Sequence, residues 1–152
     1  MHAPALKDLM DIRSPDRCLR ESQGEGRAVT ATTIGKHVLL VDDDRSLLRL
    51  VSEWLTGGGF SVVACDCFED AKQELASWEP DVLLTDLRLG AFNGLQLVIL
   101  AKQQHEHTRT VVMSAFDDPT LRQEAARCGA RYVLKPFSSK ALLDTLHDSP
   151  PA

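Results

Sequence analysis

The sequence predicts an α/β fold: a doubly wound, five-stranded parallel sheet with helices on both faces. Three observations lead to this prediction. Short apolar runs of strand length recur, amphipathic stretches of helical period alternate with them, and Gly or Pro marks the boundaries. Regular alternation of strands and helices implies parallel strands joined by right-handed crossovers. The 152 residues, 43% of them hydrophobic, suit one compact domain.

The strands are predicted from apolar runs of four or five residues. Several of these runs are continuous rather than alternating, which is typical of strands buried on both faces of a parallel sheet. Runs of this length are far too short to span a membrane. The five predicted strands comprise residues 38–41, 61–65, 82–85, 110–113 and 131–134.

Each predicted strand is followed by a stretch with helical periodicity. In the first stretch, Val51 and Leu55 fall on one face, and the glycines that begin at Gly57 end the helix. In the fourth, Pro119 and Gly129 supply the expected start and stop signals. The five predicted helices comprise residues 45–56, 68–77, 95–104, 118–128 and 139–147.

The two ends of the chain differ in composition from this alternating part. Residues 1–36 contain Gly, Ser, Thr and charges of both signs at low apolar density, so we expect a disordered N-terminal extension. A short docking segment for a partner is the alternative. Residues 148–152 form a short tail, which leaves residues 37–147 as the folded domain.

Composition and cysteine usage limit the environment of the protein. The four cysteines show neither a C-x-x-C pair nor a Cys/His ligand spacing, so free thiols are expected and a zinc site is not. The start of the chain lacks a secretory signal, and free thiols fit a reducing compartment. The formal net charge of −5 argues against direct nucleic-acid binding. We therefore expect a cytoplasmic protein with no membrane or nucleic-acid partner.

Polar residues stand at the ends of the predicted strands. Asp42 and Asp43 come after the first strand, Asp86 after the third, Ser114 after the fourth and Lys135 after the fifth. Because the carboxyl ends of parallel strands lie at one edge of a sheet, these groups should converge at its switch point. Together they could hold a divalent cation and a phosphoryl group.

The order and spacing of these motifs resemble one family, the receiver domain of bacterial two-component response regulators, as in the chemotaxis response regulator. The resemblance covers residues 37–147 and implies a flavodoxin-like sheet with strand order 2-1-3-4-5. Each motif alone is weak, but each stands at the end of a predicted strand in the order of the family. The motifs are Val41-Asp42-Asp43, Thr85-Asp86, Met113-Ser114-Ala115 and Tyr132-Val133-Leu134-Lys135-Pro136-Phe137.

The resemblance implies that Asp86 accepts a phosphoryl group from a histidine kinase or phosphotransfer protein in a Mg²⁺-dependent reaction. Mg²⁺ would be bound by Asp43, Asp86 and the backbone carbonyl of Arg88, with Asp42 acting mainly through a bound water. Oxygen ligands of this kind suit Mg²⁺, which prefers a tight octahedron. No enzymatic activity is implied beyond this self-phosphotransfer and autodephosphorylation.

The resemblance also implies a conformational output. Lys135 and Ser114 would bind the phosphoryl group, and Ser114 and Tyr132 would act as switch residues. Pro136 is best explained by a cis bond or a rigid turn that aims Lys135 inward. The switched surface would be the face formed by residues 118–147, which would contact a downstream protein target or a second copy in a homodimer. Because no output domain follows that face, a stand-alone receiver is expected.

The loop after Asp86 departs from the pattern of the family. Gly90 stands where the family usually has Pro, and it should loosen the loop that carries the Arg88 carbonyl. Asn93 replaces the frequent Asp before the next Gly. The bulky side chains of Arg88 and Phe116 are expected to flank the acyl phosphate, to hinder attacking water and so to lengthen the phosphorylated lifetime.

Three other functions share part of the pattern. A phosphorylation-independent receiver-like adaptor would keep the fold without the chemistry. A phosphatase of the haloacid-dehalogenase class would use Asp42 as its nucleophile, but a later acid pair in the right strand context and a cap insertion are lacking. A flavodoxin-like flavin protein needs a phosphate-binding loop after the first strand, where the acids would repel the flavin phosphate.

Helix capping is a structural alternative for the acids that follow the first strand. Capping would need only one of those acids, and we assign that role to Asp44.

Overall fold

The structure is a computed structural model that describes residues 36–147. The predictions for the tail and, apart from Lys36, for the N-terminal extension fall on residues outside this range. Within it, no helix is long and apolar enough to cross a membrane. Within this range, Cys67 and Cys128 are free thiols, as predicted.

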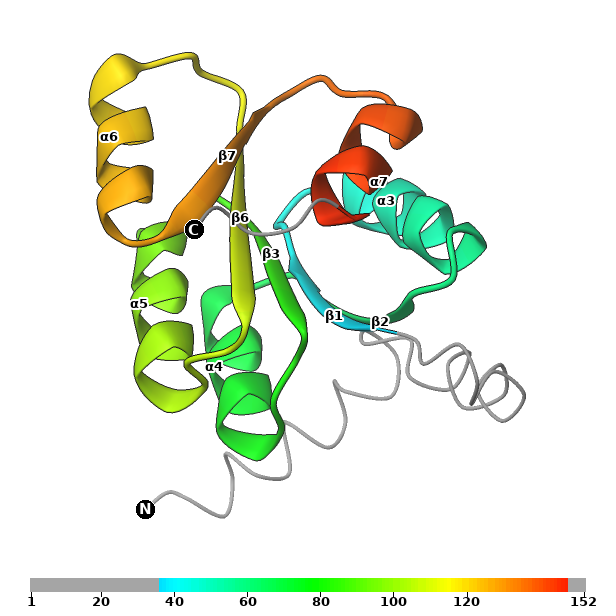
Figure 1. Ribbon diagram of the computed structural model, residues 1–152, viewed down its shortest axis with the longest axis horizontal. Coiled ribbons are helices and arrows are strands. Elements are labelled where there is room, and N and C mark those ends of the chain that lie inside the picture. The colour runs from blue at the N-terminus through cyan, green and yellow to red at the C-terminus, as the bar shows by residue number, and fades with distance from the viewer. Residues whose placement is uncertain (1–35, 148–152) are drawn as a thin grey trace.

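A parallel sheet of five strands forms the centre of the described region (Figure 1). Its strand order is β2-β1-β3-β6-β7, which confirms the predicted order 2-1-3-4-5 once two short extra strands are set aside. In register, Leu84 of the central strand lies between Leu40 and Val111 of its neighbours. The strands are β1 (His37–Val41), β2 (Ser61–Cys65), β3 (Val82–Asp86), β6 (Arg109–Ser114) and β7 (Ala130–Leu134).

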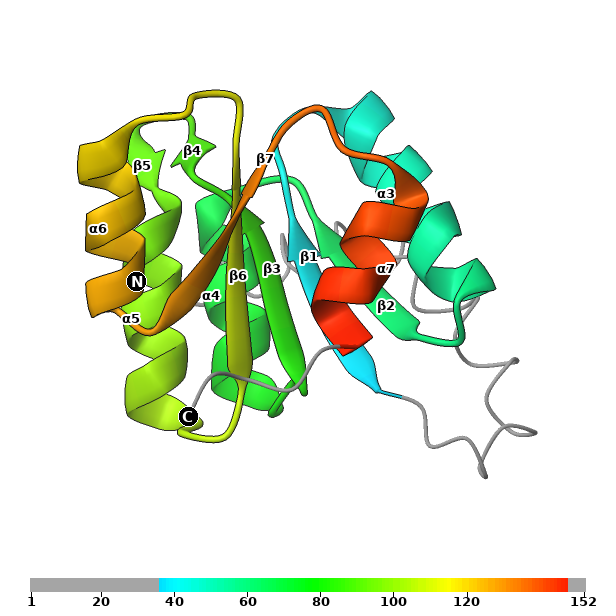
Figure 2. The same ribbon diagram turned by 45° about the horizontal axis from the view of Figure 1, so that its top comes forward.

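Helices cover both faces of the sheet, so the predicted doubly wound arrangement is confirmed (Figure 2). Helices α3 and α7 pack on one face, and α4, α5 and α6 pack on the other. Helix bounds differ from the predicted ones by at most one residue at either end. The helices of the described region are α3 (Arg45–Gly57), α4 (Phe68–Ser77), α5 (Gly94–Gln104), α6 (Pro119–Arg127) and α7 (Ser139–His147).

Acidic side chains cap two of these helices. Asp44 precedes α3 and its carboxylate accepts hydrogen bonds from the backbone N–H groups of Ser46 and Leu47. Asp118 does the same before α6, which therefore begins at Pro119 rather than at residue 118. A capping side chain satisfies N–H groups that have no partner within the helix. The capping role assigned to Asp44 is thereby confirmed.

The segment after β3 is more regular than a loop. Strands β4 (Arg88–Leu89) and β5 (Phe92–Asn93) pair as a small antiparallel hairpin. Gly90 lies in its turn with φ +63°, a conformation that side-chain-bearing residues adopt rarely. The simple loop expected here was wrong, because the conformational freedom of Gly90 allows a tight turn that keeps the two short strands paired.

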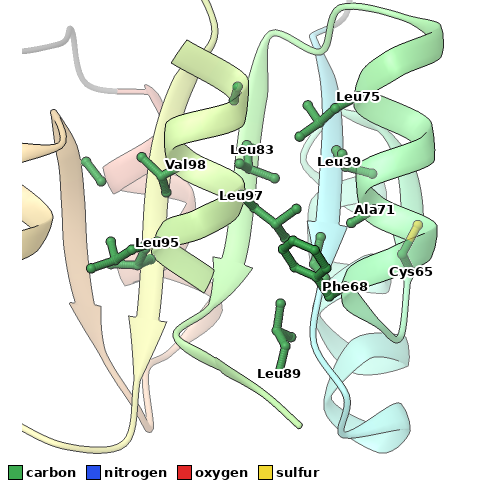
Figure 3. Packing of buried hydrophobic residues seen from close by; sticks show 14 of the residues in the cluster. Leu39, Cys65, Phe68, Ala71, Leu75, Leu83, Leu89, Leu95, Leu97 and Val98 are labelled. Atoms are coloured by element: carbon green, nitrogen blue, oxygen red, sulfur yellow. The ribbon is translucent and has the colours of Figure 1, made fainter. Parts of the chain in front are cut away.

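Two apolar clusters, one on each face of the sheet, form the core. On the α4–α5 face, Leu39, Leu83 and Leu97 lose all contact with solvent, and Figure 3 shows them between sheet and helices. On the α3–α7 face, Leu40 and Leu142 do the same. Each fully buried leucine contributes about 1.5–3 kcal/mol. This double-sided burial holds the strands rigidly, and their carboxyl ends therefore form a fixed edge.

Candidate functional site

The carboxyl edge of the sheet carries the residues that the sequence singled out. Asp86 is the last residue of β3 and Ser114 the last residue of β6. Asp42 and Lys135 directly follow β1 and β7. Because all four strands run parallel in one sheet, their carboxyl ends meet at the same edge.

Lys135 links two of the acids. Its Nζ lies 3.0 Å from Asp42 Oδ2 and 3.1 Å from Asp86 Oδ1. The side chain of Asp42 is 1% exposed and that of Asp86 is 13% exposed, so water screens these charges weakly. The Lys135–Pro136 peptide bond is cis, as one of the two predicted explanations of this proline required. The lysine thus lies inside the site as a cation shared by two carboxylates.

Three carboxylates come together beside this lysine. Oxygen atoms of Asp42, Asp43 and Asp86 all lie within 4.8 Å of one another. The Asp43 carboxylate is exposed and accepts a hydrogen bond from the N–H of Gly90 at 3.3 Å. Three like charges at this spacing repel one another unless cations neutralise them. A set of hard oxygen donors, one of them open to solvent, fits a small divalent cation such as Mg²⁺.

The charges at this edge change the protonation of Asp86. Burial and the nearby charge of Asp42 raise the pKa of Asp86 from 3.8 to about 6, against the opposing effect of Lys135. For Lys135, burial lowers the pKa, but the hydrogen bond and charge of Asp42 outweigh it and raise the pKa above its usual 10.5. Lys135 therefore stays cationic, while Asp86 titrates near pH 6.

A second group of potential ligands lies at the end of β2. Atoms of Asp66, Cys67 and Asp70 also come within 4.8 Å of one another. Arg45 already neutralises Asp66, with Nε and a terminal nitrogen both 3.0 Å from its Oδ2. Burial raises the pKa of the Cys67 thiol, which disfavours the thiolate that binds metals. This group is therefore a poorer metal site than the one around Asp86.

Phe116 connects the predicted switch residues. Ser114 Oγ accepts a hydrogen bond from the N–H of Phe116 at 3.0 Å and donates one to its carbonyl at 3.2 Å. The hydroxyl of Tyr132 donates to the same carbonyl. The guanidinium of Arg88 lies 5.0 Å from the centre of the Phe116 ring, so the two predicted flanking residues do meet. In this conformation the Ser114 hydroxyl is bonded to the loop and not to Asp86.

Sequence reasoning assigned no role to several contacts at this edge. The Phe116 carbonyl is a backbone group, and any residue type could have supplied it. Thr85 and Gly94 both contact the backbone of Asp86, and neither was singled out for it. The sequence signal that could have pointed to the Gly94 contact is the position of this glycine directly after the helix-capping residue Asn93.

The chain is similar to known proteins over most of its described length. The family model of the response regulator receiver domain matches residues 38–147. The response regulator protein FleR of Pseudomonas aeruginosa is 37% identical over 108 residues, which are 70% of this chain and 23% of that protein. The DNA-binding transcriptional regulator NtrC of Escherichia coli is 35% identical over 101 residues, 66% of this chain and 22% of that protein. The chain thus spans less than a quarter of the length of either relative.

Solved structures share the fold. The chemotaxis response regulator CheY4 of Vibrio cholerae has a TM-score of 0.69 at 27% identity, over 74% of this chain and 96% of that one. A response regulator of Burkholderia pseudomallei, solved with a phosphorylated aspartic acid, calcium ion and citrate, has a TM-score of 0.70 at 22% identity. That match covers 74% of this chain and 66% of the other.

Proposed function

The chain belongs to the response regulator receiver domain family, the domain phosphorylated on aspartate in two-component signalling, and on that premise we propose that Asp86 is its phosphorylated residue. The phosphoryl donor is a histidine kinase or a phosphotransfer protein. The observation that carries this proposal is the ammonium of Lys135 bridging Asp42 and Asp86 beside Asp43. We assign the receiver to residues 37–147, with residues 1–36 as an extension and 148–152 as a tail.

In the proposed reaction a carboxylate oxygen of Asp86 attacks the phosphorus of a phosphohistidine. An O–P bond forms as the N–P bond breaks, and the departing imidazole takes a proton from solvent. Lys135 pairs with the phosphoryl oxygens as a point charge, in place of the carboxylate oxygen it now contacts. Later attack by water breaks the O–P bond and returns the carboxylate and inorganic phosphate, so the domain catalyses nothing beyond its own modification and demodification.

Mg²⁺ would be held by the carboxylates of Asp42, Asp43 and Asp86 and by the backbone carbonyl of Arg88. Their oxygen donors and their accumulated negative charge support this assignment. The ion would neutralise charge between the incoming phosphoryl group and the carboxylates. Asp43 is the exposed member of the group, which leaves an entry path for the ion.

We propose that Ser114 and Tyr132 convert phosphorylation into a change of surface. Turning Ser114 toward the phosphoryl group would break both of its bonds to Phe116, whose carbonyl also holds Tyr132. Reversing a 1:99 equilibrium needs about 5.5 kcal/mol of differential binding, and charge-assisted bonds from Ser114 and Lys135 supply part of it. The affected face consists of α6, β7 and α7.

The proposed change of surface indicates which partners the protein would bind. The switched face would bind a downstream protein target or a second copy of the chain, without direct contact to nucleic acid or membrane. We propose that the receiver acts in the cytoplasm, and the coverage of 96% of the CheY4 chain supports the comparison with that regulator.

Acetyl phosphate with Mg²⁺, followed by peptide mass mapping, tests the phosphorylation site. The label is expected on the peptide that carries Asp86 and should be absent from Asp86→Asn. Label on Asp42 would instead support a phosphatase of the haloacid-dehalogenase class. A folded protein that takes no label from acetyl phosphate, beryllofluoride or the purified kinases of its source organism would point to a phosphorylation-independent adaptor.

The contact between Arg88 and Phe116 predicts a slow loss of phosphate. A cation–π contact at an exposed site is worth about 0.5–1 kcal/mol. Removing both side chains that hinder the attacking water, with Arg88→Ala and Phe116→Ala, should lower the barrier by a similar amount and speed dephosphorylation roughly two- to fivefold. Decay of the labelled protein after removal of the donor measures this rate. Arg127→Ala, on the distant end of α6, serves as the control and should decay at the wild-type rate. An unchanged decay rate in the double variant would contradict the shielding role.

A further inference from the structure

The backbone of Asp86 is held by a side chain that never touches the carboxylate. Thr85 is fully buried, and its Oγ1 donates a hydrogen bond to the carbonyl oxygen of Asp86 at 2.9 Å. Thr85 lies on the same face of β3 as Leu83, toward α4 and α5. The hydroxyl therefore acts on the Asp86 peptide from the side of the sheet where those helices pack.

Gly94 closes the other side of this peptide. A Cβ atom at this first residue of α5 would lie 2.1 Å from the Asp86 carbonyl oxygen and 3.1 Å from Thr85 Oγ1. A residue without a side chain is therefore needed for α5 to begin so close to β3. The N–H of Gly94 also donates to the carbonyl of Leu87 at 2.6 Å, and the N–H of Leu87 donates to Met113 of β6 at 2.8 Å. Both peptides that follow the Asp86 side chain are thus tied to neighbouring elements.

Packing of the sheet does not require the hydroxyl of Thr85. Its register partners are Val41 in β1 and Val112 in β6, and both are fully buried. Valine has nearly the shape of threonine and is the residue type that the neighbouring strands use at this level. A hydroxyl at position 85 therefore has a purpose other than filling the core.

We propose that Thr85, together with the bare Cα of Gly94, is a positioning residue for the phosphoryl acceptor. By holding the peptide between residues 86 and 87, it fixes where the Asp86 side chain starts and so keeps the carboxylate aligned with Lys135 and Asp43. This inference rests on the proposed function of Asp86. Small errors in alignment are costly, since a displacement of about 1 Å can slow a reaction by up to about 100-fold.

The test compares two buried threonines in the intact chain. Thr85→Val removes the hydroxyl at the site and keeps the shape of the side chain. Thr110→Val is the matched control, because Thr110 is also buried and its Oγ1 also donates to a backbone carbonyl, that of Gly129, away from the site. Saturation kinetics of phosphorylation by acetyl phosphate give the maximal rate and the half-saturating donor concentration, and urea unfolding reports stability.

Thr85→Val is expected to lower the maximal rate of phosphorylation by at least about tenfold, with little change in the half-saturating concentration of acetyl phosphate. Thr110→Val should keep the wild-type rate. Thr85→Ser, which restores the hydroxyl, should regain most of the rate. Should Thr85→Val fail to fold, Thr85→Ala takes its place with the same expectation. The positioning role is wrong if a folded variant without the hydroxyl is phosphorylated at the wild-type rate, or if both valine variants are slowed equally. Either result would leave the proposed function of Asp86 intact. Absence of label in the wild type overturns the proposed function and this inference with it.

Discussion

Replacing Asp86 by Asn is expected to stabilise the metal-free protein by on the order of 3 kcal/mol at pH 8. The carboxyl has a pKa of about 6 in the folded protein, against 3.8 as its ordinary value, chiefly because of burial and the charge of Asp42. Folding therefore disfavours the ionised form. Asn resembles the neutral carboxyl in shape and carries no charge to bury.

The pH dependence of this effect has a defined sign. Below pH 3.8 the carboxyl is protonated in both the folded and the unfolded chain, so ionisation of Asp86 costs no stability. As the pH rises toward 6, the unfolded chain ionises first and the folded state loses stability. Above pH 6 the full cost is present. The advantage of Asp86→Asn should thus grow between about pH 4 and pH 6 and then level off.

Urea unfolding in EDTA at several pH values measures this effect. Asp144→Asn, at an exposed ion pair with Lys140, is the control and should change stability little at any pH. Adding Mg²⁺ should reduce the difference in stability between Asp86→Asn and the wild type. A ligand that binds the folded wild type stabilises it by about 2.7 kcal/mol when its concentration is 100 times its Kd. A variant that is less stable than wild type at pH 8, or an advantage independent of pH, would contradict the electrostatic account of the site.

Gly94→Ala is expected to destabilise the protein by about 3 kcal/mol, the upper part of the range for overpacked cores. The new Cβ would meet the carbonyl oxygen of Asp86 at 2.1 Å, and a backbone atom in a central strand cannot move aside as a flexible side chain can. Either α5 begins further from the sheet or the Asp86 peptide rotates. Rotation would displace the Asp86 side chain, and a shift of α5 would weaken the hydrogen bond from Gly94 to Leu87 that holds the same segment. Phosphorylation by acetyl phosphate should therefore slow as well.

Gly57→Ala provides the matched control. Gly57 is the exposed last residue of α3, and a Cβ there would have no neighbour within 4 Å. Alanine should therefore raise stability by up to about 1 kcal/mol through its helix propensity. Opposite shifts of the two variants in urea unfolding are the expected result. If Gly94→Ala were as stable as wild type, the close approach of α5 to Asp86 would be wrong.

The fold could be predicted from the sequence because its signals are local. Apolar runs such as Val38–Val41 are buried on both faces of the sheet, and burial on both faces requires continuous rather than alternating apolar residues. Asp44 is likewise a local signal, since a cap bonds N–H groups two and three residues further on. The hairpin of β4 and β5 was missed because strands of two residues carry almost no periodicity.

By itself, the sequence determined the elements, their order along the chain and the polar residue at the end of each strand, since these depend on neighbours a few residues away. The tertiary structure alone decided how those polar residues meet. Lys135 contacts Asp42 and Asp86 across 93 and 49 residues of sequence, and the resulting burial and charge set the pKa of Asp86. The tertiary structure also decided the contacts of Phe116 and Gly94. A contact through a backbone carbonyl leaves no mark in residue type, and a glycine allows a close approach without showing which segment approaches.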